Sequence, residues 1–299
     1  MNEREHNIDK NTDFKILARS ISLIENETNN YKEILFNLKP SSSKIIGITG
    51  APGAGKSSLA DALIGEMIND NNKVGVLCVD PSSPFNKGAL LGDRIRMSEW
   101  YNHPNVFIRS LASKGSLGGL HPKIIEISDV MKSAGFDYVI IETVGVGQSE
   151  VDIAALADIT IVMLVPEGGD IIQTMKAGLM EVADIFLINK FDRPGAQNFY
   201  NSLKQMLSPV FKKMSKQIPV IKTVASEKEG VSELYKKIND WQFDDQSQQK
   251  INLLTEKIWS LIQNGKMKNF DKEKMKIDIS KAAFNPDFNM YSFAKEYEE

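Results

Sequence analysis

Residues 50–57 constrain the fold of this chain more than any other segment. They read Gly-Ala-Pro-Gly-Ala-Gly-Lys-Ser, which fits the pattern G-x-x-x-x-G-K-S. The apolar run 45–48 precedes them, and residues 59–64 continue with helical spacing. This order of strand, glycine-rich loop and helix is the context that a phosphate-binding loop requires. The segment therefore predicts a P-loop fold with a nucleoside triphosphate as ligand.

The residue types of this loop suggest how it would hold phosphate. Glycines let backbone N–H groups turn inward around phosphate oxygens, and the helix start adds partial positive charge. We expect Lys56 to reach the β- and γ-phosphates and the Ser57 hydroxyl to ligate Mg²⁺. The predicted nucleotide-contacting residues here are Gly50, Ala51, Pro52, Gly53, Ala54, Gly55, Lys56, Ser57 and Ser58.

Composition excludes several classes of partner. The chain of 299 residues is 42% hydrophobic and 25% charged, with a net charge of −3, which argues against non-specific binding to nucleic acid or anionic membrane. The single cysteine, Cys78, excludes an intrachain disulfide and a cysteine-cluster metal site. No apolar stretch approaches the roughly 20 residues that span a bilayer, and the N-terminal sequence does not resemble a signal peptide. We therefore expect a cytoplasmic protein with no membrane or nucleic-acid partner.

Short apolar runs alternate with helical patterns from residue 44 onward. Candidate strands lie at 45–49, 74–79, 106–110, 138–142, 159–165, 185–189 and 219–224. Several of them are apolar on nearly every residue, as in parallel strands that are covered on both faces. Candidate helices lie at 57–68, 123–133, 171–182, 196–214 and 231–241. The alternation predicts an α/β fold with a doubly wound, mostly parallel sheet.

The two ends of the chain have a different pattern. Residues 12–37 show helical spacing, and residues 40–43 form a Pro-Ser linker. Beyond Trp241 a polar stretch leads to an amphipathic pattern at 251–262, then to a Lys-rich, weakly patterned stretch at 266–276 and a last helical pattern at 288–297. We expect an N-terminal helical extension at 1–40, a nucleotide-binding domain at 41–242 and a C-terminal helical arm at 243–299.

A second motif indicates which base is bound. Asn189-Lys190-Phe191-Asp192 follows a late candidate strand and fits N-K-x-D. The Asp192 carboxylate can accept hydrogen bonds from guanine N1–H and the exocyclic amine, whereas adenine offers no matching pair of donors. Asn189 would brace the loop and the Lys190 stem would lie over the base. Alone, the motif could be a loop whose aspartate caps a helix; after a phosphate loop it favours guanine.

The loop after the next strand is a weaker guanine signal. Residues 223–226 occupy the place of the loop whose backbone amide meets guanine O6. The match is loose, and its candidate contacts are Val224, Ala225 and Ser226.

Acidic residues follow two of the candidate strands. Glu142 begins an acidic-x-x-Gly signal, so its carboxylate would hold Mg²⁺ directly or through water, and the Gly145 N–H would contact the γ-phosphate. Residues 145–150 would form a flexible segment that orders around triphosphate, although an ordinary strand-end turn is the simpler alternative. Asp80 ends another strand, at the edge where open α/β sheets bind ligands.

Other polar residues have weaker signals. Asp93 precedes a helical pattern and could simply cap it. Asp170 lies in a further glycine-containing loop, and Lys176 follows it as a residue typical of an exposed surface. The three histidines are scattered, so a transition metal has no evident docking site.

Taken together, the motifs resemble those of the MeaB/ArgK-type G proteins, the methylmalonyl-CoA mutase-associated GTPases of the SIMIBI class. The likeness rests on G-A-P-G-A-G-K-S at 50–57, V-D-P-S-S at 79–83, G-D-R-I-R-M at 92–97, H-P-N-V-F-I-R-S at 103–110, L-G-G-L at 117–120, E-T-V-G-V-G-Q-S-E at 142–150 and G-G-D-I-I-Q-T-M-K-A-G at 168–178.

The resemblance assigns roles to these segments. It implies that Asp80, Asp93 and Glu142 join Ser57 around Mg²⁺. Residues 81–97, 143–152 and 166–178 become three switches, the third of which contacts the partner through residues such as Asp170 and Lys176. Apart from the resemblance, Gln148 could by its position orient the attacking water, or it could simply be a polar residue of the switch; Lys56 and Glu142 are the other catalytic candidates. The C-terminal arm would dimerise the protein.

The resemblance also implies a function. The protein would be a GTPase chaperone that gates the loading, protection or reactivation of adenosylcobalamin on a B12-dependent acyl-CoA mutase, with methylmalonyl-CoA mutase as the expected partner. GTP hydrolysis would be slow and partner-stimulated, because no intrinsic arginine finger is evident among Arg94, Arg96 and Arg109.

Three alternatives remain open at this point. A metallochaperone of the same class would need Cys/His ligand clusters. A P-loop kinase acting on a small molecule or a transport protein would prefer ATP. A purely structural role would leave Lys56→Ala without functional effect.

Overall fold

The computed structural model describes residues 8–28, 31–80, 97–113, 120–145, 149–167, 182–214, 218–241, 248–267 and 272–282. The chain divides into two compact units, Met1–Asp244 and Asp245–Glu299. In the described parts of the second unit lie two helices, α11 (Gln248–Met267) and α12 (Lys272–Ala282).

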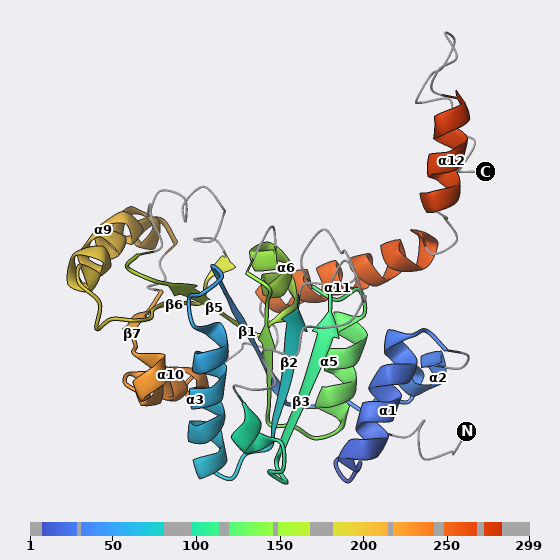
Figure 1. Cartoon of the computed structure of the whole chain (residues 1–299), viewed down its shortest axis with the longest axis horizontal. Helices are drawn as coiled ribbons and strands as arrows, with labels where there is room; N and C mark the ends of the chain where they lie inside the picture. Colours follow the sequence, from blue (N-terminus) through green and yellow to red (C-terminus); the bar gives the residue numbers. More distant parts are fainter. Residues whose placement is uncertain are drawn as a thin grey trace. The chain divides into compact units, whose positions relative to one another are not determined.

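A seven-stranded sheet forms the centre of the first unit (Figure 1). Its strands are β1 (Lys44–Gly50), β2 (Val74–Asp80), β3 (Val106–Ala112), β4 (Tyr138–Glu142), β5 (Ile159–Leu164), β6 (Ile185–Ile188) and β7 (Val220–Lys222). Their order is β3-β2-β4-β1-β5-β6-β7, and every neighbouring pair is parallel. The predicted α/β fold with a parallel sheet is therefore confirmed.

Helices cover both faces of this sheet, which explains why its strands are apolar on successive residues. On one face, Ile46 and Ile48 of β1 share a core with α3 (Lys56–Asn69) and α10 (Val231–Asn239). On the other face, Ile45 shares a core with four helices: α1 (Phe14–Glu25), α2 (Tyr31–Phe36), α5 (Ile124–Ser133) and α6 (Ser149–Leu156). A third cluster joins β5 and β6 to α9 (Ala196–Met214). Two short 3₁₀ turns, Ser98–Trp100 and Ala225–Glu227, complete the described elements.

Ion pairs attach the N-terminal helices to the body of the first unit. Arg109 Nη2 of β3 donates to Glu25 Oε2, at the end of α1, at a distance of 2.8 Å. Lys123, at the start of α5, pairs with Glu27 at 2.8 Å and with Glu126 at 3.0 Å. Burial by itself would lower the pKa of Lys123, but the two carboxylates raise it above its ordinary value. The lysine therefore remains charged and keeps these contacts at neutral pH.

Two segments differ from the expectations drawn from the sequence. The stretch after Glu142, expected to be flexible through residue 150, begins helix α6 at Ser149. This helix packs so closely on β1 that a Cβ at Gly47 would lie 2.5 Å from Ile153 Cγ1. The Lys-rich stretch 266–276, expected to be weakly structured, contains the end of α11 and the start of α12. Most of the candidate helix 171–182, and all of 288–297, lie outside the described residues.

In the described part of the chain, no helix is both long enough and apolar enough to traverse a bilayer.

Candidate nucleotide site

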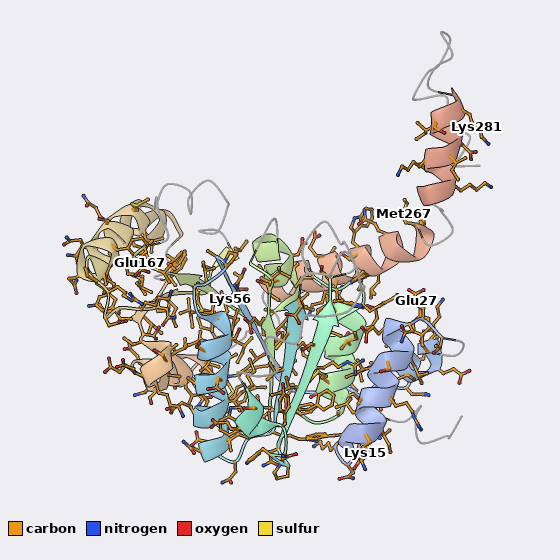
Figure 2. All side chains as sticks on the ribbon, viewed as in Figure 1. Lys15, Glu27, Lys56, Glu167, Met267 and Lys281 are labelled. Carbon is orange, nitrogen blue, oxygen red and sulfur yellow. The ribbon has the colours of Figure 1, made fainter. Side chains whose placement is uncertain are left out.

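The glycine-rich loop lies between the end of β1 and the start of α3, where Figure 2 labels Lys56. Gly55 caps the helix with a left-handed φ of 96°, and a Cβ there would lie 2.4 Å from Asn189 Nδ2, so only glycine fits. Lys56 is 7% exposed and its Nζ donates to the carbonyl oxygens of Gly50 at 3.0 Å and Ala51 at 3.2 Å. The loop thus holds its ammonium group over its own backbone, beside the amino end of a helix that favours anions.

Hydroxyl and carboxylate oxygens gather beside this loop. The Ser57 hydroxyl donates to Glu142 Oε1 at a distance of 2.7 Å, and both side chains are buried. Asp80, also buried, ends β2, the strand that pairs with β4, so it lies at the same edge of the sheet as Glu142. Hard oxygen ligands of this kind are those that Mg²⁺ prefers. The donor set therefore fits a magnesium ion held at the carboxyl edge of β2 and β4.

The segment that follows β4 touches the phosphate loop directly. Thr143 N–H donates to Ile48 O at 3.1 Å, which ties the end of β4 to β1. Gly145 has a φ of 80°, and a Cβ there would lie 2.4 Å from Gly50 O and 2.6 Å from Lys56 Nζ. A side chain at position 145 would displace the phosphate-loop lysine or carbonyl. The backbone of Gly145 is thus close enough to respond to whatever the loop binds.

The N-K-F-D segment begins with a buried amide that joins three loops. Asn189, 3% exposed, donates from Nδ2 to Ala54 O at 2.8 Å. Its Oδ1 accepts from Ala225 N at 3.0 Å and from Thr223 Oγ1 at 3.2 Å. The Asn189 side chain therefore contacts the phosphate loop and the loop after β7 while it belongs to the N-K-F-D loop, so it links all three.

The other residues of the motif lie nearer the surface. Lys190 adopts a left-handed φ of 55°, and the Asp192 side chain is 50% exposed. Arg193 Nε lies 3.8 Å from Asp192 Oδ2 and 3.6 Å from Glu167 Oε1, a residue labelled in Figure 2. In the loop after β7, Val224 and Ala225 are buried whereas Ser226 is exposed. The Asp192 carboxylate is therefore exposed enough for the base of a nucleotide to reach it.

Six residues singled out from the sequence lie outside the described residues: Asp93, Arg94, Arg96, Gln148, Asp170 and Lys176. The other predicted nucleotide and metal residues lie at the carboxyl edge of the sheet, in the loops that follow it or in the first turn of α3, whereas Arg109 lies in the middle of β3. Sequence reasoning missed Lys222 and Tyr200, whose side chains contact Phe191. No motif marks them, since they come from β7 and α9 and meet Phe191 only in the folded chain.

A parallel sheet with a glycine-rich phosphate loop after its central strand, and N-K-x-D after a later strand, is the arrangement of a P-loop NTPase fold. The family model "Methylmalonyl Co-A mutase-associated GTPase MeaB" matches residues 17–271. The chain belongs to this family, and it is a GTPase that binds guanine nucleotide.

Individual relatives agree with this assignment. A Pyrococcus abyssi protein, provisionally named a GTPase, is 47% identical over 236 residues, covering 77% of this chain and 73% of the relative. GTPase ArgK of Escherichia coli is 40% identical over 202 residues, covering 66% and 60%. The fused isobutyryl-CoA mutase of Geobacillus kaustophilus is 40% identical over 188 residues, which are 61% of this chain and 17% of that protein.

Among solved structures, this chain is similar to a protein named LAO/AO transport system kinase. The TM-score is 0.64 at 25% identity, and the match covers 96% of this chain and 94% of the other. The likeness extends over nearly the full length of both chains.

Replacing Gly145 with alanine should lower GTP turnover at least about tenfold, equivalent to about 1.4 kcal/mol in the barrier. The new Cβ would collide with Gly50 O and Lys56 Nζ. Phosphate release at saturating GTP measures the effect. Gly195→Ala is the matched control, because Gly195 also has a left-handed φ, 84°, but a Cβ there would meet nothing within 4 Å. Equal turnover by the two variants would contradict the assignment.

Proposed function

We propose that this GTPase is a chaperone for an adenosylcobalamin-dependent acyl-CoA mutase, with methylmalonyl-CoA mutase as the expected partner. It would gate the loading, protection or reactivation of the cofactor, which stays on the mutase. The observation that carries the proposal is the relative in which 188 matching residues are part of a fused isobutyryl-CoA mutase. A GTPase domain of this kind joined covalently to a mutase supports direct association of the two. The family description points to the same class of partner.

At the phosphates, the proposed chemistry is positioning and charge neutralisation. Lys56 would neutralise the β- and γ-phosphates together with the amides of the loop. Mg²⁺ would be held by Ser57, Asp80 and Glu142, with Asp93 as a further ligand, and would supply positive charge at the γ-phosphate. The burial of these three described side chains and the Ser57–Glu142 hydrogen bond support this set of ligands.

The same contacts suggest how the partner would sense the nucleotide. We propose residues 143–152 as a switch, since Gly145 touches the phosphate loop and α6 begins only four residues later. Gln148, between the two, is the proposed water-orienting residue. Residues 81–97 and 166–178 would act as the other switches, with Asp170 and Lys176 facing the mutase. Binding of the γ-phosphate would therefore change the conformation of the segment that leads into α6, and the partner would contact that segment.

Slow intrinsic hydrolysis is part of the proposal. Arg109, one of three candidate arginines, donates from Nη2 to Glu25 at 2.8 Å and to Ser22 at 3.0 Å. Both contacts are with residues of α1, so they hold the Arg109 side chain against that helix. Positive charge for the transition state would then come from Arg94, Arg96 or the partner, and partner-supplied charge is a common way to accelerate such enzymes.

We also propose the division into an N-terminal extension at 1–40, a GTPase domain at 41–242 and a C-terminal arm at 243–299 that forms a homodimer. The described part of the arm supports this, because α11 exposes several large apolar side chains. They are Ile251, Ile258, Trp259, Leu261, Ile262 and Met267. Apolar side chains grouped on one helix are typical of a surface that another protein covers.

The kinase alternative raised by the sequence is also suggested by the name of the structural relative. It requires preferential binding of ATP and phosphoryl transfer to a second substrate. The N-K-x-D motif instead favours guanine over adenine, because the Asp192 carboxylate would pair with donors that adenine lacks.

Glu142→Gln should raise the Mg²⁺ concentration that gives half-maximal GTP turnover at least about tenfold, since a neutral amide binds the cation more weakly. A magnesium titration of turnover measures this shift. Glu126→Gln is the matched control: Glu126 is also buried, but it lies on α5 and pairs with Lys123. An unshifted titration for Glu142→Gln would remove Glu142 from the metal site.

Adding saturating methylmalonyl-CoA mutase should raise GTP turnover by at least about tenfold, because the partner would complete the charge stabilisation. Steady-state phosphate release with and without mutase measures this. Lys56→Ala should abolish both the basal and the stimulated rates. Unchanged turnover, together with no complex on size-exclusion chromatography with any adenosylcobalamin-dependent acyl-CoA mutase, would contradict the proposed function.

A further inference from the structure

We infer that Lys222 is a positioning residue for guanine recognition, because it holds the ring of Phe191, the residue between Lys190 and Asp192. The inference rests on the proposed role of Asp192 as the group that reads the base. It adds a residue from β7 to a site otherwise built from recognised motifs. Lys222 would act through the loop and would not touch the nucleotide.

Lys222 lies among aromatic side chains from two other elements. Its Nζ is 4.7 Å from the centroid of the Phe191 ring and 4.2 Å from that of Tyr200 on α9. It also donates to Gln197 Oε1 at 3.1 Å. The two rings pack edge to face, with centroids 6.3 Å apart and planes at 88°. A cation within about 6 Å of two ring centroids is attracted to both, so Lys222 links Phe191 to α9.

The backbone of Phe191 is fixed from the same strand end. Its N–H donates to Thr223 O at 3.0 Å, and Thr223 is the neighbour of Lys222. One residue earlier, Lys190 has a left-handed φ of 55°. Residues other than glycine rarely adopt this backbone conformation, and they keep it where the surrounding structure holds it. Phe191 is thus held by its backbone through Thr223 and by its ring through Lys222.

Asp192 needs this support because its own side chain is 50% exposed. Packing restrains an exposed carboxylate less than a buried one. Its position therefore depends more on the backbone that carries it. Guanine recognition requires both carboxylate oxygens to meet N1–H and the 2-amino group together. A small displacement of the loop would therefore weaken one of the two hydrogen bonds before the phosphates lose any contact.

The test compares GDP with IDP, whose base lacks the 2-amino group. The ratio of their dissociation constants reports the second hydrogen bond of Asp192, and loss of general stability would weaken both nucleotides equally. Lys222→Met, which keeps most of the stem and removes the charge, should lower the ratio Kd(IDP)/Kd(GDP) by about fivefold. Lys222→Arg should keep the ratio within about twofold of wild type, since arginine also packs on aromatic rings.

Lys204→Met is the matched control. Lys204 Nζ lies 4.8 Å from the centroid of the same Tyr200 ring, but Lys204 is exposed on α9. Its loss should leave the ratio unchanged. If Lys222→Met does not fold, Phe191→Leu provides the same test, because leucine keeps apolar bulk and removes the ring; it should lower the ratio by a similar factor.

The outcomes separate this inference from the role of Asp192. A wild-type ratio near one would overturn guanine reading by Asp192, and with it the inference. A wild-type protein that discriminates, combined with an unchanged ratio in Lys222→Met or in its substitute Phe191→Leu, would overturn the inference alone. An equal loss of affinity for GDP and IDP would show that Lys222 serves only stability.

Discussion

The buried amide of Asn189 joins the parts of the site that bind phosphate to the parts proposed to bind the base. Its Nδ2 donates to Ala54 O in the phosphate loop, and its Oδ1 accepts from Ala225 N and Thr223 Oγ1. A buried polar group left without these partners would cost about 1–3 kcal/mol. The contacts are possible only because β1, β6 and β7 run parallel and end at one edge of the sheet. The sheet therefore sets the distance between the phosphate loop and the N-K-F-D loop. The hydrogen bond from Asn189 to Ala54 O joins the two loops at that distance.

Around this fixed connection, the segment after β4 is the part placed to report on the phosphates. Gly145 lies against Gly50 O and Lys56 Nζ, Glu142 accepts from Ser57, and helix α6 follows from Ser149. Elsewhere in the first unit, Arg109–Glu25 and Lys123–Glu27 attach the N-terminal helices to β3 and α5. The molecule thus combines an anchored scaffold with a short connection between the phosphate loop and one helix. This arrangement suits a protein that is proposed to pass the state of its nucleotide to a partner.

Much of the sheet was predictable because buried parallel strands are apolar on successive residues, and the motif residues were predictable because their chemistry demands fixed spacing. Helix α6 was missed: its stability comes from packing over Gly47, a tertiary contact that its short sequence does not reveal. Helix α12 was missed because Lys272–Ala282 is rich in lysine and lacks a strong apolar stripe. Lys222, Phe191 and Tyr200 come from three separate elements, so their cluster exists only in the fold. The roles of the residues at the site remain predictions.

We propose that the state of the bound nucleotide controls how tightly this GTPase binds the mutase. Calorimetric titration of this protein into methylmalonyl-CoA mutase, once with GDP and once with a non-hydrolysable GTP analogue, measures that control directly. We expect the two dissociation constants to differ by at least about tenfold, which is a coupling free energy of about 1.4 kcal/mol. Because coupling is reciprocal, the mutase should change the ratio of analogue to GDP affinity by the same factor. Equal dissociation constants in the two nucleotide states would show that the nucleotide does not control binding to the mutase.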